Sequence, residues 1–273
     1  MYLVRYLVKI LMIEKIMSRY SSENITRLLF FPILFFLTLF KIVNRVVRSL
    51  IGLPINNTLM LDLEHLCHKH SLETRGVIHI GAHEGQEIDL YQKMGFQNIL
   101  FIEANPVVFE RLKETIKDFS NAIAVNCAIN NFNGETVLYV TSFDQSSSLL
   151  PLKKVKQIYP FIVESRQIKI QSKTLDQLLN EQNLEPSDFN MINIDIQGAE
   201  LLAFQGAINT LKYIEAINTE VNYQELYEGC AIIEQIDEFL NNKGFQRVAT
   251  VTPFHPSWGD AFYVKEKQEN KQN

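Results

Sequence analysis

The chain has 273 residues, of which 47% are hydrophobic and 21% charged, and its formal net charge is −5. This length accommodates one sizeable domain with an extension, and the hydrophobic fraction is sufficient for a packed core. The net negative charge gives no support for nucleic-acid binding. The three cysteines, Cys67, Cys127 and Cys230, are too few and too far apart for a disulfide framework, which favours reduced thiols in a cytoplasmic protein.

The first 50 residues differ in charge from the rest of the chain. Their net charge is +6, which leaves −11 for residues 51–273. Within them, residues 28–40 (LLFFPILFFLTLF) carry no charge, but this run is shorter than the roughly 20 apolar residues of a membrane-spanning helix. We therefore predict a helical extension at 1–55. Its apolar run has three interpretations: a segment on the membrane surface, a buried or partner-docking helix, or a true span.

From residue 56 the pattern is that of a globular domain, predicted to extend to residue 265 and to be followed by a disordered tail at 266–273. Because predicted strands alternate with helices in its first half, we expect β-α-β units and a parallel sheet. The expected elements are a helix at 58–70, a strand at 77–80, a helix at 86–94 ending at Gly95, a strand at 98–104, a helix with Asn105 as N-cap and Pro106 at its first position, and a strand at 122–129.

The second half of the domain is less regular. The expected elements are an alternating strand at 134–140, a polar loop at 144–151, a strand and helix at 166–179 with a cap near Thr174, a strand at 189–196, a helix at 200–211, a strand at 213–221, a helix at 232–242 and an antiparallel pair at 245–251 and 260–266. The predicted fold is therefore α/β: a doubly wound, mostly parallel, seven-stranded Rossmann-like sheet with an antiparallel C-terminal strand pair.

The turn after the first predicted strand indicates the kind of cofactor. Residues 81–85 read Gly-Ala-His-Glu-Gly, and Glu103 ends the next strand, where an acid can accept hydrogen bonds from both hydroxyls of a ribose. The glycines are spaced G-x-x-x-G, not G-x-G-x-x-G as in a dinucleotide site, and Glu84 and Glu87 lie nearby. These carboxylates would repel a diphosphate but not a sulfonium, which favours S-adenosylmethionine. A glycine turn that only closes a β-α unit is the alternative.

Four segments resemble successive motifs of the FkbM-type methyltransferases: IHIGAHEGQE (78–87), FIEANP (101–106), SKTLDQLL (172–179) and INIDIQGAELLAFQGA (192–207). The resemblance covers roughly residues 74–264. It implies an S-adenosylmethionine-dependent enzyme that methylates hydroxyls, often of sugars or natural products. Carried over residue by residue, it implies that the cofactor is bound by Gly81, Ala82, His83 and Gly85 in the turn, by Glu103 and Asn105 at the ribose, by Cys127 and Ala128 beside the adenine, and by Asp195.

His79 and His83 depart from the family's usual pattern D-x-G-A-N-x-G, in which an aspartate and an asparagine occupy their places. Both are still predicted to bind the cofactor, His79 from the end of the strand and His83 from the turn, because a histidine can form one hydrogen bond, although it cannot supply a fixed negative charge. Weaker cofactor binding, or compensation by Glu84, would follow. A catalytically silent binding module tethered by the N-terminal arm is therefore the alternative function. A nucleotide-dependent oxidoreductase is disfavoured by the missing third glycine.

Methyl transfer to an alcohol is assisted by a general base placed at a strand end near the methyl group. Asp195 is the first candidate by position, Glu220 the second and His255 the third. Each has a structural alternative: Asp195 would anchor the cofactor or its turn, Glu220 would order a loop, and His255 would be an ordinary loop residue. No metal is expected, because the histidines near residue 65 have no matching ligands at zinc spacing and two acids on adjacent strands do not make a metal site.

The acceptor pocket is predicted to come from three loops, at 144–151, 222–230 and 252–260. Their aromatic rings, hydroxyls and carboxylates suit a carbohydrate. The expected partner is therefore a small-molecule or glycan hydroxyl acceptor, with no nucleic acid. The basic, apolar arm at 1–50 adds the hypothesis of peripheral contact with the inner face of the membrane and a lipid-linked or membrane-proximal glycan.

Overall fold

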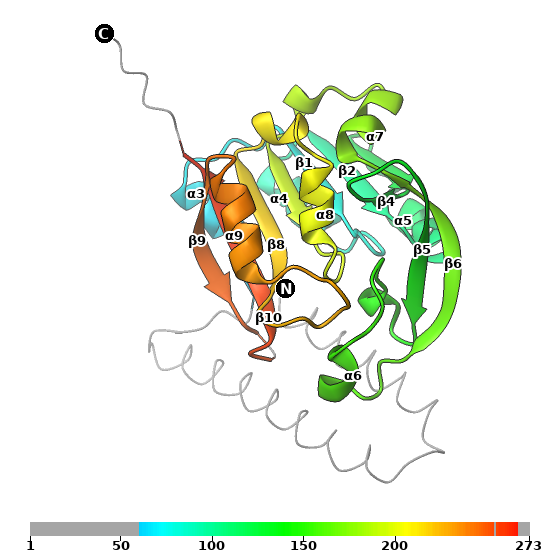
Figure 1. Cartoon of the computed structure of the whole chain (residues 1–273). Helices are drawn as coiled ribbons and strands as arrows, with labels where there is room; N and C mark the ends of the chain where they lie inside the picture. Colours follow the sequence, from blue (N-terminus) through cyan, green and yellow to red (C-terminus); the bar gives the residue numbers. More distant parts are fainter. Residues whose placement is uncertain (1–59, 254, 267–273) are drawn as a thin grey trace, which may run out of the picture. The chain divides into compact units, whose positions relative to one another are not determined.

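The structure is a computed structural model that describes residues 60–253 and 255–266 (Figure 1). The predictions for residues 1–55, for the start of the first helix at 58 and for the tail from 267 onward lie outside the described residues. None of the helices within the described ranges is long and apolar enough to cross a membrane. The boundaries proposed for the folded domain, 56 and 265, stay predictions.

The main sheet has seven strands in the order β3-β2-β1-β7-β8-β10-β9, and five of them, β3 to β8 in this order, pair in parallel. The strand β10 lies between β8 and β9 and runs antiparallel to both. This arrangement confirms the predicted mostly parallel sheet with its C-terminal antiparallel pair. The strands are β1 (Gly76–Ile80), β2 (Asn98–Glu103), β3 (Ala122–Asn126), β7 (Met191–Ile194), β8 (Ala216–Asn222), β9 (Phe245–Val251) and β10 (Trp258–Lys265).

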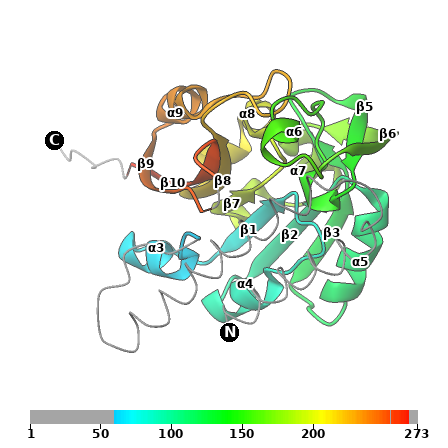
Figure 2. The same cartoon turned by 90° about the horizontal axis from the view of Figure 1, so that it is seen from below.

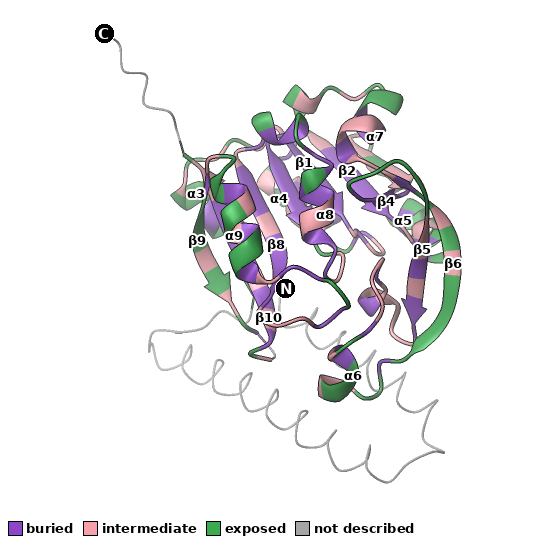
Figure 3. Ribbon diagram, viewed as in Figure 1, coloured by how far each residue is buried: buried purple, intermediate pink, exposed green. Residues whose placement is uncertain are grey.

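Helices cover both faces of this sheet, as Figure 2 shows. One face packs against α3 (Leu63–Lys69), α4 (Ile88–Met94) and α5 (Pro106–Ile116), and the other against α7 (Leu175–Glu181), α8 (Glu200–Gln205) and α9 (Ile233–Asn241). The four central strands β1, β2, β7 and β8 are almost wholly buried between these layers, whereas the edge strands β3 and β9 are partly exposed (Figure 3). The near-continuous apolar character of the central strands therefore follows from burial on both sides.

Several helix boundaries follow from local side-chain chemistry. Asn105 caps α5, its side chain accepting a hydrogen bond from the backbone N–H of Val107, and Pro106 is the first helical residue, as predicted. Thr174 caps α7 in the same way, accepting from Gln177. Gly95 ends α4 in the left-handed conformation that glycine favours. These local signals therefore determine where α4, which follows β1, ends and where α5, which follows β2, begins.

A second, three-stranded sheet was not predicted. It has the order β4-β6-β5 and lies beside the main sheet (Figure 1). Its strands are β4 (Ala128–Ile129), β5 (Gly134–Thr141) and β6 (Glu164–Lys173). The strand predicted at 122–129 therefore ends early, because the Asn126 side chain bonds the carbonyls of Glu103 and Ala104 and the chain then joins β6.

The helix predicted at 200–211 also ends early, at Gln205. Gly206 lies against β4, where a Cβ atom would come 2.1 Å from the carbonyl oxygen of Asn130. The chain then forms a separate 3-10 turn at Thr210–Lys212, whose start is held by the Asp176 carboxylate. Tight backbone packing therefore overrides the helical periodicity of this segment.

Replacing Gly206 with alanine is expected to lower the free energy of unfolding by about 2 kcal/mol or more, because overpacking against rigid backbone forces it to shift. Gly229→Ala is the comparison for backbone strain without a clash: its φ of +73° is unfavourable to alanine, unlike the φ of −85° at Gly206, but a Cβ there meets no atom within 4 Å. Urea unfolding of the two full-length variants measures the difference. Equal losses of stability would contradict the packing explanation.

Candidate active site

A cleft that is partly open to solvent lies at the carboxyl ends of β1, β2 and β7. The strand order reverses between β1 and β7, and open α/β sheets bind their ligands at such a point. Among the residues predicted as site residues, the cleft is lined by Gly81, His83, Glu103, Cys127, Ala128 and Asp195. Residues of the loop that follows β5 form the opposite wall, namely Asp144, Gln145, Ser147, Ser148 and Leu149.

The turn at 81–85 needs both of its glycines. Gly81 has a φ of +80°, and a Cβ atom there would lie 2.0 Å from the carbonyl oxygen of Asp195. Gly85 has a φ of +74°, and its Cβ would lie 2.6 Å from a methyl group of Leu112 on α5. The first glycine therefore brings the ends of β1 and β7 together, and the second packs the turn onto α5 without lining the cleft.

Glu103 is held by two backbone N–H groups, one in the turn at 81–85 and one at the start of α5. One carboxylate oxygen accepts the N–H of His83 at 2.8 Å and the other accepts the N–H of Asn105 at 2.7 Å. Burial raises the pKa of this carboxyl, whereas the two N–H donors act in the opposite direction by stabilising the charged form. Each oxygen keeps a second lone pair, so the oriented carboxylate can accept two more hydrogen bonds from a vicinal diol such as a ribose.

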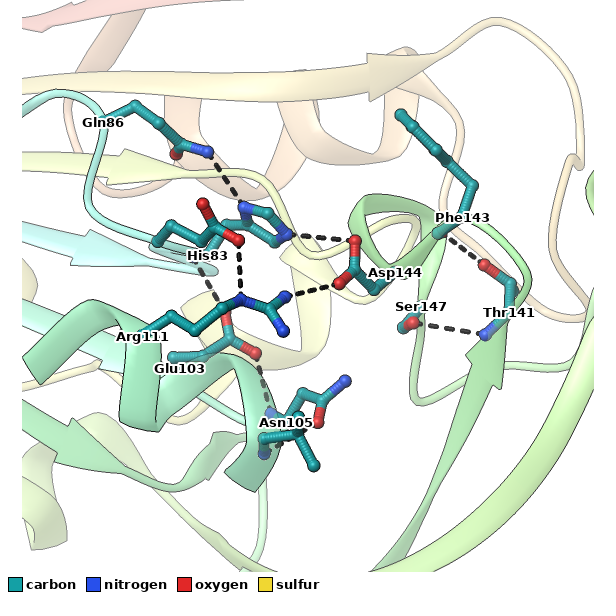
Figure 4. A network of polar contacts seen from close by, with 11 residues as sticks. His83, Gln86, Glu103, Asn105, Arg111, Thr141, Phe143, Asp144 and Ser147 are labelled. Carbon is teal, nitrogen blue, oxygen red and sulfur yellow. Dashed lines mark hydrogen bonds and ion pairs between the residues drawn. The ribbon is translucent and has the colours of Figure 1, made fainter. Parts of the chain in front are cut away.

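An ion-pair network joins the turn to the opposite wall of the cleft (Figure 4). Asp144 accepts hydrogen bonds from Arg111 of α5 at 2.6 Å and from the His83 ring at 3.1 Å, and Arg111 also contacts Glu84 at 2.6 Å. The bond from His83 and the neighbouring Arg111 lower the pKa of Asp144 to about 2. The cation nearest the turn is thus already shared between two carboxylates.

This network makes the stability of the protein depend on Asp144. Because its pKa is lower in the folded protein than in the unfolded chain, its contribution is complete above about pH 4 and is lost as the pH falls toward 2. Asp144→Asn is therefore expected to be less stable than the wild type at pH 7, with a difference that shrinks as the pH falls below about 4. Urea unfolding of both full-length proteins across this range measures it; a difference independent of pH would contradict the ion-pair explanation.

Two further acids lie close together where β7 and β8 reach the cleft. Asp195 follows β7 and is exposed at the cleft, whereas Glu220 in β8 is buried. The side-chain amide of Gln197 donates a hydrogen bond of 2.6 Å to each of them. Burial, and then the charges of Asp195 and Glu200, raise the pKa of Glu220 well above its ordinary value. Glu220 therefore keeps its proton to higher pH than an ordinary glutamate does.

The segment between these acids is fixed by Glu200, the first residue of α8. Its carboxylate accepts the backbone N–H groups of Ile196 and Gly198 at 2.9 and 3.1 Å. Burial raises the pKa of Glu200 to about 7. Glu200 thus positions the turn that carries Gln197 and is too deeply buried to face a ligand.

His79 lies in β1, on the sheet face covered by α4, and does not line the cleft. Its ring packs near the rings of Tyr91 and Phe101, and its Nδ1 lies 3.2 Å from the Tyr91 hydroxyl. Burial lowers its pKa, so the imidazole is neutral and adds no positive charge beneath the cleft. The structure therefore does not bring His79 into the turn beside its predicted partners.

The remaining predicted residues have varied surroundings. Ala82 is buried beneath the turn and Asn105 is the N-cap of α5, so both shape the cleft from outside its lining. Burial raises the pKa of Cys127 to about 11, which makes its thiol a neutral wall of the cleft. His255 accepts a hydrogen bond from the N–H of Ser257 and lies beside the Tyr159 ring, with no contact to Asp195 or Glu220.

The three loops predicted to form the acceptor pocket do come together. The backbone N–H of Glu228 donates to the carbonyl of Pro151, and that of Lys153 donates to the carbonyl of Leu226. The backbone N–H of Tyr223 donates to the carbonyl of Ser257. A fourth segment, α6 (Val155–Ile158) with Tyr159, was not predicted and packs against the same loops. The Trp258 indole N–H donates a hydrogen bond to the Tyr159 hydroxyl. The charge of Glu220 contributes to raising the pKa of Tyr159, so this aromatic pair lies near Glu220.

These features fit S-adenosylmethionine. The Glu103 carboxylate can accept hydrogen bonds from a ribose, the apolar lining at Ile102, Ala128 and Leu149 can pack against an adenine, and Asp195 can face a sulfonium. Because Arg111 is engaged by Glu84 and Asp144, a diphosphate would find no unpaired arginine at the turn. The chemistry of the donor set therefore suits a cofactor without phosphate.

The chain is similar to several known proteins. The model of the FkbM methyltransferase domain matches residues 79–247. The 2-O-methyltransferase NoeI of Sinorhizobium fredii is 27% identical over 172 residues, which cover 60% of this chain and 70% of that protein. Among solved structures, an S-adenosylmethionine-dependent methyltransferase from Aquifex aeolicus is 10% identical, with 76% of this chain and 90% of that chain covered and a TM-score of 0.42. Magnesium protoporphyrin IX methyltransferase from Synechocystis is 8% identical, with 75% and 76% covered and a TM-score of 0.42.

The match to the family model begins at His79 in β1 and ends at Arg247 in β9. It includes the turn at 81–85, Glu103, Asp195 and Glu220, and it spans more than half of the chain. This assignment favours an enzyme over a silent binding module and over an oxidoreductase. The chain belongs to the FkbM methyltransferase family and is an S-adenosylmethionine-dependent methyltransferase.

Proposed function

We propose that the protein transfers a methyl group from S-adenosylmethionine to a hydroxyl group of a sugar or glycan. The observation that carries this proposal is the pair of carboxylates, Asp195 exposed at the cleft and Glu220 buried beside it, both held by Gln197. An alcohol keeps its proton at neutral pH and benefits from such a base. The name of the relative NoeI, a 2-O-methyltransferase, also supports a hydroxyl acceptor.

In this proposal the cofactor is held by the residues that line the cleft. Glu103 accepts the two ribose hydroxyls, Cys127 and Ala128 flank the adenine, and Gly81 and His83 contact the cofactor from the turn. Ala82, Gly85 and Asn105 keep the turn and the start of α5 in place. His79 acts indirectly, as a neutral residue packed under the turn.

The bound cofactor supplies an electrophilic methyl group on a positively charged sulfur. Asp195 accepts a hydrogen bond from the acceptor hydroxyl and so directs the oxygen toward that methyl group. As the oxygen–carbon bond forms and the carbon–sulfur bond breaks, the hydroxyl proton moves to Asp195. Glu220 stabilises this transfer by sharing the proton within the pair. His255 remains a third candidate, placed near the aromatic pair of the acceptor loops.

The acceptor is proposed to be uncharged near its reacting hydroxyl. The carboxylate of Asp195, which lines the cleft, would repel a phosphate or carboxylate placed there. The Tyr159 and Trp258 rings, linked by a hydrogen bond, offer an apolar surface of the kind that sugar rings pack against. A neutral polyhydroxyl compound satisfies both requirements.

The test is an acceptor screen with the full-length protein and S-adenosylmethionine labelled in its methyl group. A panel of neutral glycans, sugar phosphates, nucleic acid and protein separates the acceptor classes. The proposal expects label on a neutral glycan as an ether, which resists alkaline hydrolysis. Label found only on nitrogen, or as an alkali-labile ester, would contradict it.

A membrane-proximal acceptor is a further part of the proposal, together with a cytoplasmic location at the inner face of the membrane. It is supported by the charge of +6 and the apolar run within residues 1–50. Flotation of the full-length protein with anionic phospholipid vesicles, compared with neutral vesicles, tests this contact. Absence from both vesicle fractions would exclude it.

A further inference from the structure

Every polar group of the Gln197 side chain has a partner at the candidate site. Its amide nitrogen donates to Asp195 and to Glu220, each at 2.6 Å, and its amide oxygen accepts the Tyr227 hydroxyl at 2.6 Å. Its backbone carbonyl accepts the Ser148 hydroxyl at 2.8 Å. One residue thus connects the ends of β7 and β8, the loop after β8 and the far wall of the cleft.

The orientation of this amide follows from its neighbours. If the amide were turned round, its oxygen would face two carboxylates, an unfavourable arrangement of acceptors. The Tyr227 hydroxyl, which is buried, donates to the oxygen and so holds the nitrogen toward the acids. Gln197 also has a φ of +57°, a left-handed conformation that costs a residue with a side chain about 1 kcal/mol or more. Strained residues of this kind cluster at functional sites.

The chemistry of an amide suits this position better than that of a charged residue. A lysine would form an ion pair with both acids and make them weaker bases, and a glutamate would add a third negative charge. An uncharged double donor fixes one oxygen of each carboxylate and leaves the other oxygen of Asp195, which lines the cleft, for the acceptor. The other titratable groups around the pair are Glu200, Asp260, Tyr159 and Tyr227.

We propose that Gln197 is a positioning residue for methyl transfer, which aligns Asp195 and Glu220 as one proton-accepting pair, and that Tyr227 sets its orientation. This inference rests on the proposed function, since it assigns the pair the role of base. It predicts that the two carboxylates respond together to any change at Gln197. A role limited to folding would leave their proton affinities unchanged.

The test compares Gln197→Met, which keeps the length of the side chain but has no donor, with the wild-type full-length protein. Loss of two N–H donors is expected to move the titrations of Asp195 and Glu220, followed by carbon-13 NMR of their carboxyl groups, to higher pH by about one unit. At pH 7, kcat is expected to fall about 100-fold, with little change in KM for S-adenosylmethionine. Gln205→Met is the matched control, because Gln205 is exposed on α8 and bonds Asn131.

Tyr227→Phe provides a second variant that keeps the amide. It is expected to shift both titrations in the same direction by a smaller amount, since the amide loses only the group that orients it. Unchanged titrations in folded Gln197→Met would overturn the inference. The NMR measurement needs no acceptor, so a failed acceptor screen with shifted titrations would count against the proposed function and leave the positioning role standing.

Discussion

Replacing Glu220 with glutamine is expected to lower kcat for methyl transfer about 100-fold or more, while the affinity for S-adenosylmethionine stays the same. Glutamine has nearly the same shape as the protonated acid but cannot exchange a proton with Asp195. Glu220 does not line the cleft, so cofactor binding has no direct reason to change. Kinetics with an acceptor from the screen, together with calorimetry for the cofactor, separates these two quantities.

Glu225→Gln is the control for this experiment, because Glu225 lies in the loop that follows β8, is only partly buried and is paired with Lys153. Its kcat is expected to remain within about twofold of the wild type. A Glu220→Gln enzyme with normal kcat would show that the buried acid has no part in the reaction.

The same Glu220 variant has a predicted signature in stability. Burial raises the pKa of Glu220, so the folded protein keeps a proton that the unfolded chain loses above about pH 4.3. Wild-type stability therefore falls as the pH rises through this range toward the folded pKa. Glu220→Gln cannot lose that proton, and its stability is expected to lack this decline. A gain in stability with a loss of kcat is the combination expected for a residue kept for function.

Replacing Glu103 with alanine is expected to weaken S-adenosylmethionine binding about 100-fold or more. Two hydrogen bonds from ribose hydroxyls to a charged group are lost, each worth about 1.5–3 kcal/mol. The backbone N–H groups of His83 and Asn105 would also lose their acceptor, which loosens the turn. Calorimetric titration of the full-length protein measures the change.

Glu114→Ala, on the exposed side of α5, is the control for Glu103→Ala and is expected to bind the cofactor normally. A small effect of Glu103→Ala, below about threefold, would mean that the ribose lies elsewhere. Loss of binding in a variant that still unfolds cooperatively in urea would place the effect at the site.

The elements that were predicted correctly depend on residues that lie close to them in the sequence. The N-cap at Asn105 and the C-terminal glycine at Gly95 depend on their own backbone neighbourhood, and the apolar strands depend on burial from both sides. The second sheet has no such local signal. Ala128 and Ile129 continue the apolar run of β3, and only their pairing with β6, more than 40 residues later, separates them from it.

The candidate site shows the same limit. The turn at 81–85, Glu103 and Asp195 stand at strand ends, so topology places them at one cleft. The pairing of Arg111 with Asp144 joins residues 33 apart on different elements and carries no spacing signal. Gln197 lies inside the D-I-Q-G-A-E segment, but its contacts with Glu220 and Tyr227 depend on how β8 and the following loop fold back. His79 illustrates the reverse case: its place in the motif suggested the turn, whereas strand alternation directs its side chain to the α4 face.

The most direct test is a crystal structure of the full-length protein with S-adenosylhomocysteine, the demethylated product of the cofactor. The account predicts both ribose hydroxyls on the Glu103 carboxylate and the adenine beside Cys127 and Ala128. It also predicts the sulfur facing the acids Asp195 and Glu220. A ribose bound away from Glu103, or a sulfur directed away from these two acids, would contradict the assignment of the cleft and of the base.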